Sequence, residues 1–215
     1  MRFLTSALIA EGSSDDRFLP FLLRRSLEDV CATDFADDVD VDQVTVLRRR
    51  QRPPTVPEII GVVEANADTF HLVFVHRDQD GNTDRVRREW LDPLAEAWGT
   101  SRPERWVPVV PVRKSEAWVL ADGNALRSVL GVRWADADLG VPGRPRDVER
   151  IGEPKVPIRR LVDRLGRPIE DFYEELAEAI SLDVLTTVPS FLAVRECTVR
   201  AIADLGYRPR RGRTS

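Results

Sequence analysis

Apolar residues in the first half of the chain alternate between short unbroken runs and runs with helical spacing. The runs at 3–10, 44–47, 70–75 and 106–112 have the length and the β-branched or aromatic content of buried strands. Between them, the apolar pattern predicts helices through 18–30, 59–63 and 86–98, the last interrupted at Pro93. Strands that alternate with helices in this way are typical of an α/β fold with a mainly parallel sheet.

The second half of the chain has a different pattern. Beyond about residue 123 the strand signal ends, and helices are predicted at 126–130, 158–165, 169–180 and 189–205 around a Gly- and Pro-rich loop. We therefore expect an α/β core at 1–122, a helical extension packed on the same domain at 123–207, and a flexible tail at 208–215.

Composition limits the partners and the metals. A chain of 215 residues with 42% hydrophobic residues can bury a core, and no apolar run is long enough to span a membrane. The first twelve residues make a poor signal peptide, so we expect a cytoplasmic protein. With two histidines, and with Cys31 and Cys197 outside any zinc-like spacing, a bound metal would have oxygen ligands.

The net charge of −4 favours no particular partner, but the basic residues are unevenly distributed. Lys114 and Lys155 are the only lysines, so arginine richness by itself carries little weight. The cluster Arg48, Arg49, Arg50 and Arg52 follows a predicted strand and is our candidate for contacts with a nucleic-acid backbone. A solvated arginine surface explains the same cluster at least as well.

Carboxylates follow three of the predicted strands. Glu11 comes after the first, Asp78 and Asp80 after the third, and Glu116 after the fourth. In an open parallel sheet these strand ends share one edge, where ligands bind. Converging carboxylates repel one another unless cations neutralise them, and the sequence shows no lysine or histidine cluster. Single acids at strand ends are common in turns, but this ordered set predicts a site for Mg²⁺ or Mn²⁺.

The same segments resemble the Toprim fold, the metal-binding domain of topoisomerases, primases and OLD-family nucleases. The segments LIAEGSSDDRFLPFLL, VFVHRDQDG and VPVRKSEAWVLAD are most similar to an uncharacterised family of stand-alone bacterial Toprim-like proteins. The resemblance covers most of the chain and rests on the order of Glu11-Gly12, Asp78-Gln79-Asp80, Glu116-Ala117-Trp118, Pro154-Lys155 and Pro189-Ser190-Phe191.

This resemblance implies a three-layer Toprim-like fold and a role for each acid. Glu11 would be a metal ligand or a general acid/base, and Asp78 and Asp80 would be metal ligands. Glu116 would be a further acid of the site, and Lys155 would neutralise a phosphoryl group in the transition state. One departure concerns the central strand, where His76 and Arg77 separate its apolar run from Asp78.

The expected activity is hydrolysis of nucleic-acid phosphodiesters with Mg²⁺ or Mn²⁺, that of a Toprim-type nuclease. The resemblance also implies a separate ATPase of the ABC or SMC-like class, in an arrangement suggestive of phage defence, because this chain has no Walker A motif. Two alternatives stay open. One is a non-catalytic subunit that binds a metal or a partner and regulates an associated ATPase. The other is a different metal-dependent phosphotransferase or phosphatase on a similar scaffold.

Overall fold

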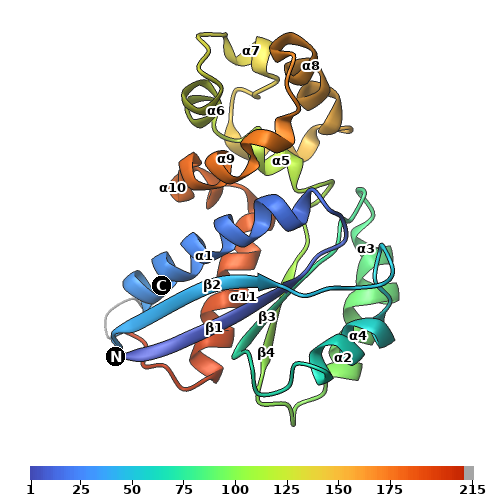
Figure 1. Ribbon diagram of the computed structural model, residues 1–215, viewed down its shortest axis with the longest axis vertical. Coiled ribbons are helices and arrows are strands. Elements are labelled where there is room, and N and C mark those ends of the chain that lie inside the picture. Colours follow the sequence, from blue (N-terminus) through green and yellow to red (C-terminus); the bar gives the residue numbers. More distant parts are fainter. Residues whose placement is uncertain (211–215) are drawn as a thin grey trace.

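Four parallel strands form the centre of the protein in the computed structural model, which describes residues 1–210 (Figure 1). The strands are β1 (Arg2–Ile9), β2 (Val39–Val46), β3 (Leu72–His76) and β4 (Arg105–Val109), in the order β2-β1-β3-β4. Each neighbouring pair is parallel, and β3 is buried along its whole length. The predicted α/β class with a mainly parallel sheet is confirmed.

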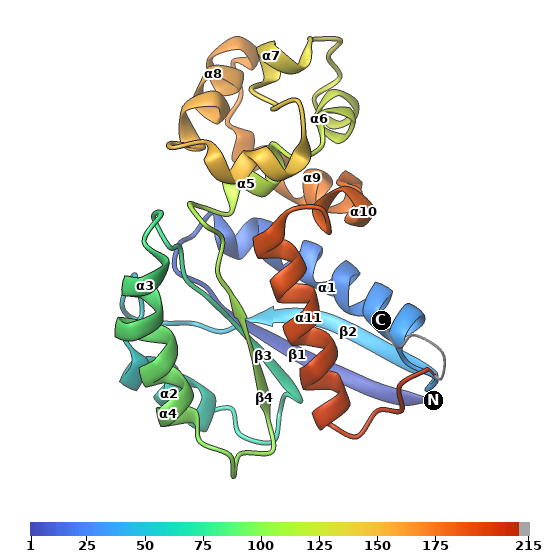
Figure 2. The ribbon, with the colours of Figure 1, turned by 180° about the vertical axis from the view of Figure 1, so that it is seen from behind.

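Helices cover both faces of this sheet and complete three layers (Figure 2). The helices α1 (Asp15–Asp34) and α11 (Pro189–Asp204) pack on one face, together with Leu8 and Phe74. The other face carries α2 (Val56–Glu64) and a continuous helical run, packed against Val73 and Val75. Successive strand residues thus point into opposite cores, as a sheet buried on both sides requires.

The helical run after β3 contains a π-helical turn at its centre. It consists of α3 (Thr83–Val86), η1 (Arg87–Leu91) and α4 (Asp92–Trp98). The sequence predicts a break at Pro93, which has no backbone N–H to donate. The structure keeps the helix continuous and widens the turn before the proline, so that the amide of Asp92 donates to the carbonyl of Arg87.

The strand β2 begins earlier than the sequence analysis predicts. Its segment VDVDQVTV alternates apolar and polar residues, with Asp40 and Asp42 exposed and Val39 and Val41 partly buried. The acidic residues had the composition of a solvated loop, and this masked the period of two. Because β2 lies at the sheet edge, exposed carboxylates there also discourage pairing with another chain.

A helical cap stands over the end of the sheet where the strands finish (Figures 1 and 2). It contains α5 (Glu116–Val119), α6 (Gly123–Leu130), α7 (Asp136–Leu139), η2 (Pro145–Arg150), α8 (Lys155–Leu165), η3 (Ile169–Phe172), α9 (Tyr173–Ala179) and α10 (Leu182–Leu185). Short helices α7 and η2 form within the predicted loop at 135–152. No helix in the described range 1–210 is both long and apolar enough to cross a membrane.

The predicted extension at 123–207 therefore serves two places in the fold. Its first part builds the cap, whereas α11 returns to the sheet and packs beside α1 and β4. Trp118 of the cap is fully buried, donates its indole N–H to Ser190 Oγ over 3.0 Å and packs edge-on against Phe191. The cap and the sheet consequently share one continuous core.

The first residues of the predicted flexible tail are attached to the fold. Pro209 forms an antiparallel bridge with Phe35, and the Arg208 guanidinium donates to Asp37 over 2.9 Å. The expectation of a flexible tail from Arg208 is therefore wrong for residues 208–210. The remainder of that tail, 211–215, lies outside the described residues.

The two cysteines differ in exposure, and this predicts their reactivity. Cys31 is 4% exposed, and burial, followed by the charge of Glu28, raises the pKa of its thiol to about 11. At pH 8 about one Cys31 in a thousand is then a thiolate, the form that reacts. Iodoacetamide should label the partly exposed Cys197 and spare Cys31 in the folded protein, as read by peptide mass spectrometry. Equal labelling of both would contradict this burial.

Candidate functional site

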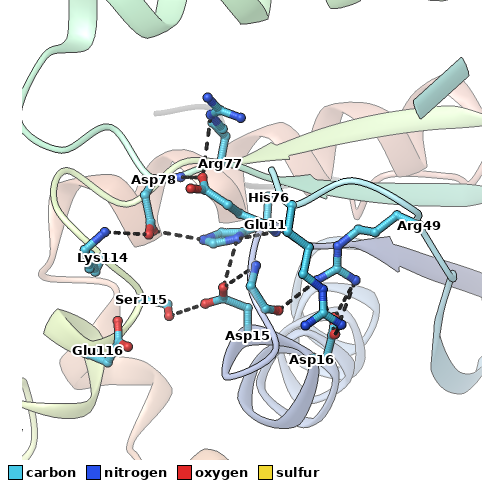
Figure 3. A network of polar contacts seen from close by, with 12 residues as sticks. Glu11, Asp15, Asp16, Arg49, His76, Arg77, Asp78, Lys114, Ser115 and Glu116 are labelled. Atoms are coloured by element: carbon cyan, nitrogen blue, oxygen red, sulfur yellow. Dashed lines mark hydrogen bonds and ion pairs between the residues drawn. The ribbon is translucent and has the colours of Figure 1, made fainter. Parts of the chain in front are cut away.

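The structure brings the predicted acids to one edge of the sheet (Figure 3). Glu11 lies two residues beyond β1, Asp78 lies two residues beyond β3, and Glu116 begins α5 beyond β4. Because the strands are parallel, their carboxyl ends meet at this edge beneath the cap. The sequence expectation that these segments share an edge agrees with this placement.

A buried histidine connects the acids. His76 ends β3 and is fully buried, with Nε2 at 3.3 Å from Asp78 Oδ1 and Nδ1 at 3.6 Å from Asp15 Oδ2. The backbone N–H of Glu11 also points at His76 Nδ1 over 3.3 Å. Two residues separate the apolar run from Asp78. His76 is the last residue of β3, and Arg77 is the first residue after it.

Asp15 belongs to this site although it is not among the acids that the sequence analysis names as candidates. Its carboxylate accepts hydrogen bonds from the Ser115 hydroxyl over 2.5 Å and from the Gly12 amide over 3.0 Å. The side chain is only 6% exposed, far less than a first-turn acid on a solvated helix would be. Asp15 begins the helix that follows the strand end at Glu11, and this position close to Glu11 is the sequence signal that could have identified it.

Burial and charge act in opposite directions on the central pair. Burial lowers the pKa of His76, but the carboxylates of Asp15, Asp78 and Glu11 raise it by more, so the net shift is upward. Burial likewise raises the pKa of Asp15, but His76, the Ser115 hydroxyl and the Gly12 amide bring it below its ordinary range. Each group of the pair thus favours the charged form of the other.

Lys114 lies between the two carboxylates of the Asp-x-Asp segment. Its Nζ is 3.2 Å from Asp78 Oδ2 and 3.0 Å from Asp80 Oδ1. Partial burial lowers the pKa of Lys114, but the hydrogen bonds and charges of Asp80 and Asp78 raise it by more. The lysine is therefore charged and neutralises the pair, a contact that the sequence analysis missed because Lys114 has no lysine neighbour.

The loop that carries Asp78 and Asp80 is held against the segment that carries Lys114. The amides of Gln79 and Gly81 donate to the carbonyls of Pro111 and Val112. Asp80 and Gly81 both have positive φ, at 48° and 78°, and a Cβ on Gly81 would meet the Arg113 guanidinium at 2.5 Å. The positive φ favours glycine at this position, whereas the end of the Arg113 side chain can shift to admit a Cβ.

Glu116 and Lys155 form a second pair at the same edge. Lys155 Nζ is 3.5 Å from Glu116 Oε1, and the carboxylate is 7% exposed while the lysine is 43% exposed. Burial raises the pKa of Glu116, Lys155 lowers it in part, and the net shift is upward. The resemblance predicts both residues at the site, and the structure brings them together although they come from different parts of the chain.

Glu11 is more exposed than Asp78 and Glu116, whose side chains are 10% and 7% exposed. Its Oε2 accepts the backbone N–H of Asp78 over 3.0 Å and lies 3.5 Å from Arg77 Nε. These contacts fix the carboxylate at the mouth of the site, where 23% of the side chain remains exposed.

The arginine cluster reaches this edge as well, but its members differ. Arg49 is 2% exposed and donates to Asp16 and to the Gly12 carbonyl, so it is engaged in the fold. Arg48, Arg50 and Arg52 are exposed. These three remain the candidates for contacts with nucleic acid.

The carboxylates at this edge have the chemistry that a hard divalent cation requires, but among the described residues they are not gathered around one position. Carboxylate oxygens are the ligands that Mg²⁺ and Mn²⁺ prefer, and the buried Asp78 Oδ1 makes no well-aligned hydrogen bond in the described part of the chain, although His76 Nε2 lies 3.3 Å away. Within residues 1–210, however, no three His, Cys, Asp or Glu side chains lie close enough together to hold an ion. The Lys114 ammonium occupies the space between Asp78 and Asp80.

Comparisons with known proteins give a distant structural likeness. No model of a protein family matches the chain, and no curated protein matches it. Two solved structures of the C-terminal region of the Xanthomonas campestris pv. campestris OLD protein are similar to it. The one phased with mercury has a TM-score of 0.43 at 15% identity and covers 94% of this chain and 98% of its own. The one phased with iodine has a TM-score of 0.41 at 16% identity, with 92% and 95% covered.

Proposed function

We propose that this protein hydrolyses phosphodiester bonds in nucleic acid with Mg²⁺ or Mn²⁺ bound at the carboxyl edge of its sheet. The observation that carries the proposal is the state of Asp78. Its side chain is 10% exposed, and its Oδ1 makes no well-aligned hydrogen bond within the described residues, its nearest donor being His76 Nε2 at 3.3 Å. A buried carboxylate oxygen is costly unless a cation or a donor compensates it. Glu11 and Asp80 flank it, and both add oxygen ligands.

The proposal gives each side chain a part. Glu11, Asp78, Asp80 and Glu116 would hold the metal, which supplies an activated water and stabilises charge on the phosphoryl group. His76 orients Asp78 from behind, as outer residues commonly do for metal-binding carboxylates. Lys155, whose ammonium is partly exposed beside Glu116, would contact a phosphoryl oxygen.

Cations around the acids support a polyanionic substrate. Arg50 and Arg52 are exposed on the loop after β2. On the cap side, a hollow of about 440 Å³ between α1 and α8 is lined by Arg17, Lys155 and Arg159. Positive groups on both sides of an acidic centre suit a phosphate backbone that crosses it.

A thermal melt tests the metal site without a substrate. Mn²⁺ at ten times its dissociation constant should stabilise the wild type by about 1.4 kcal/mol, a rise in Tm of about 3–6 °C. The variant Asp78→Asn should show no such rise, because it loses a ligand carboxylate. An equal rise in both proteins would place the metal elsewhere, and no rise in the wild type would favour the second candidate below.

The second candidate is a non-catalytic subunit that regulates a separate ATPase. It is favoured by the lysines, because Lys114 already neutralises Asp78 and Asp80, and Lys155 faces Glu116. An edge with its own cations can serve as a docking surface without a metal. This function would be supported if the purified protein alone cuts neither DNA nor RNA with Mn²⁺, and cleavage is seen only after an ATPase partner is added.

A further inference from the structure

A hollow of about 580 Å³ opens on the side of the acids away from the cap. Glu11, Asp78 and Asp80 form part of its lining, so it is continuous with the candidate catalytic edge. Its volume falls in the range of pockets that bind small organic molecules. The apolar part of its lining comes from the loop before α2 and from the helical run after β3, through Pro53, Pro54, Val56, Val86, Trp90 and Pro93.

The Trp90 side chain forms part of the wall of this hollow. The residue is 6% exposed, and its indole nitrogen has almost no accessible surface, so the carbon atoms of the ring line the hollow. An aromatic ring in such a lining can contact a nucleic-acid base. Trp90 lies in the π-helical turn η1, and such turns often occur at functional sites.

Two arginines supply positive charge at the same place. Arg77 and Arg85 line the hollow together with the acids and with Glu89. Arg85 is exposed and makes no ion pair within the described part of the chain, whereas Arg77 faces Glu11. Arg85 is therefore available to an anionic group that enters from solvent.

We infer that this hollow binds one unpaired nucleotide of the substrate, next to the phosphate that lies over the acids. The prolines, the valines and the Trp90 ring contact the base, and Arg85 contacts the phosphate. A base that is stacked and paired in a duplex cannot enter such a hollow. The substrate class is therefore single-stranded nucleic acid or a frayed strand end. This inference rests on the proposed function for the identity of the substrate.

Saturation-transfer NMR with a nucleoside 5′-monophosphate tests the hollow directly, once in EDTA and once with Ca²⁺. The wild type should transfer saturation to the base protons. Arg85→Glu should weaken binding by about tenfold, since it replaces an attraction to the phosphate by a repulsion. Arg88→Glu is the matched control, because Arg88 lies on the same helical run but not in the lining, and it should bind like the wild type.

A second pair of variants examines the Trp90 ring. Trp90→Leu should weaken nucleotide binding by about three- to tenfold, because it removes an aromatic surface from the lining, and it should lower Tm because the ring is buried. Trp98→Leu should also lower Tm but leave binding unchanged, because Trp98 is buried outside this lining.

Competition then separates the substrate classes. A short single-stranded oligonucleotide should displace the mononucleotide, and a blunt duplex of the same sequence should not. The inference is overturned if the base protons receive no saturation in either buffer, if Arg85→Glu and Arg88→Glu behave alike, or if the duplex competes equally. Base binding by a wild-type protein that cleaves neither DNA nor RNA with Mn²⁺ would uphold the hollow while the proposed hydrolysis fails.

Discussion

Replacing Glu11 by Gln should reduce Mn²⁺-dependent cleavage of DNA or RNA by about a thousandfold, equivalent to about 4 kcal/mol of transition-state stabilisation. Glutamine keeps the size of the side chain, and its carbonyl oxygen still accepts the Asp78 amide hydrogen bond that Glu11 Oε2 accepts. What it removes is the negative charge at the mouth of the site. The expected result is therefore a protein that stays folded but cleaves much more slowly. Measuring the cleavage rate and the Tm of the same variant checks both.

The matched control for this experiment is Glu96→Gln. Glu96 is an exposed acid on α4 that lines neither of the hollows beside the acids. It should retain the wild-type rate. If Glu11→Gln cleaves as fast as Glu96→Gln, Glu11 is not part of the metal site and the assignment of catalysis to this edge of the sheet fails. If Glu11→Gln is slow but also melts at a much lower temperature, the loss reflects folding and Asp78→Asn becomes the decisive variant.

The sheet could be predicted because its strands carry strong local signals. The segment 70–75 is an unbroken apolar run, and a strand buried on both faces has to be one. The edge strand β2 was predicted too short because its exposed side chains are aspartates, which composition assigns to a loop. The cap was harder to predict from the sequence. Its helices η2 and α7 are only six and four residues long, and their stability comes from packing in the tertiary structure rather than from the local sequence.

The acids of the site were predictable for a different reason from their partners. Glu11, Asp78 and Glu116 follow strands, and parallel topology alone places strand ends together. Their cations come from elsewhere, as Lys155 lies 39 positions beyond Glu116 in the sequence. Arg49 shows the opposite error, because a cluster of arginines looks solvated until the fold buries one member against Asp16. Contacts between residues that are far apart in the sequence depend on the tertiary structure and cannot be deduced from sequence spacing.

Lys114→Met should raise the affinity for Mn²⁺ by about ten- to a hundredfold. The Lys114 ammonium lies about 3 Å from one oxygen of Asp78 and one of Asp80. A divalent ion bound by these carboxylates must therefore displace the ammonium or be repelled by it. At an effective dielectric constant near 20, unit charges 4 Å apart interact by about 4 kcal/mol, and partial exposure reduces this figure. Methionine keeps a similar length without the charge.

The variant should also melt at a lower temperature in EDTA, because Asp78 then has no cation beside Oδ2. Arg113→Met is the control, since Arg113 is the neighbouring cation yet donates to the Asp80 carbonyl and to neither carboxylate. Calorimetric titration with Mn²⁺ should give it an affinity close to that of the wild type. An unchanged or weaker affinity in Lys114→Met would mean that Asp78 and Asp80 do not bind the metal together. A higher Mn²⁺ affinity in Lys114→Met, together with its lower Tm in EDTA, would mean that the lysine neutralises these carboxylates in the metal-free protein and is displaced when the ion binds.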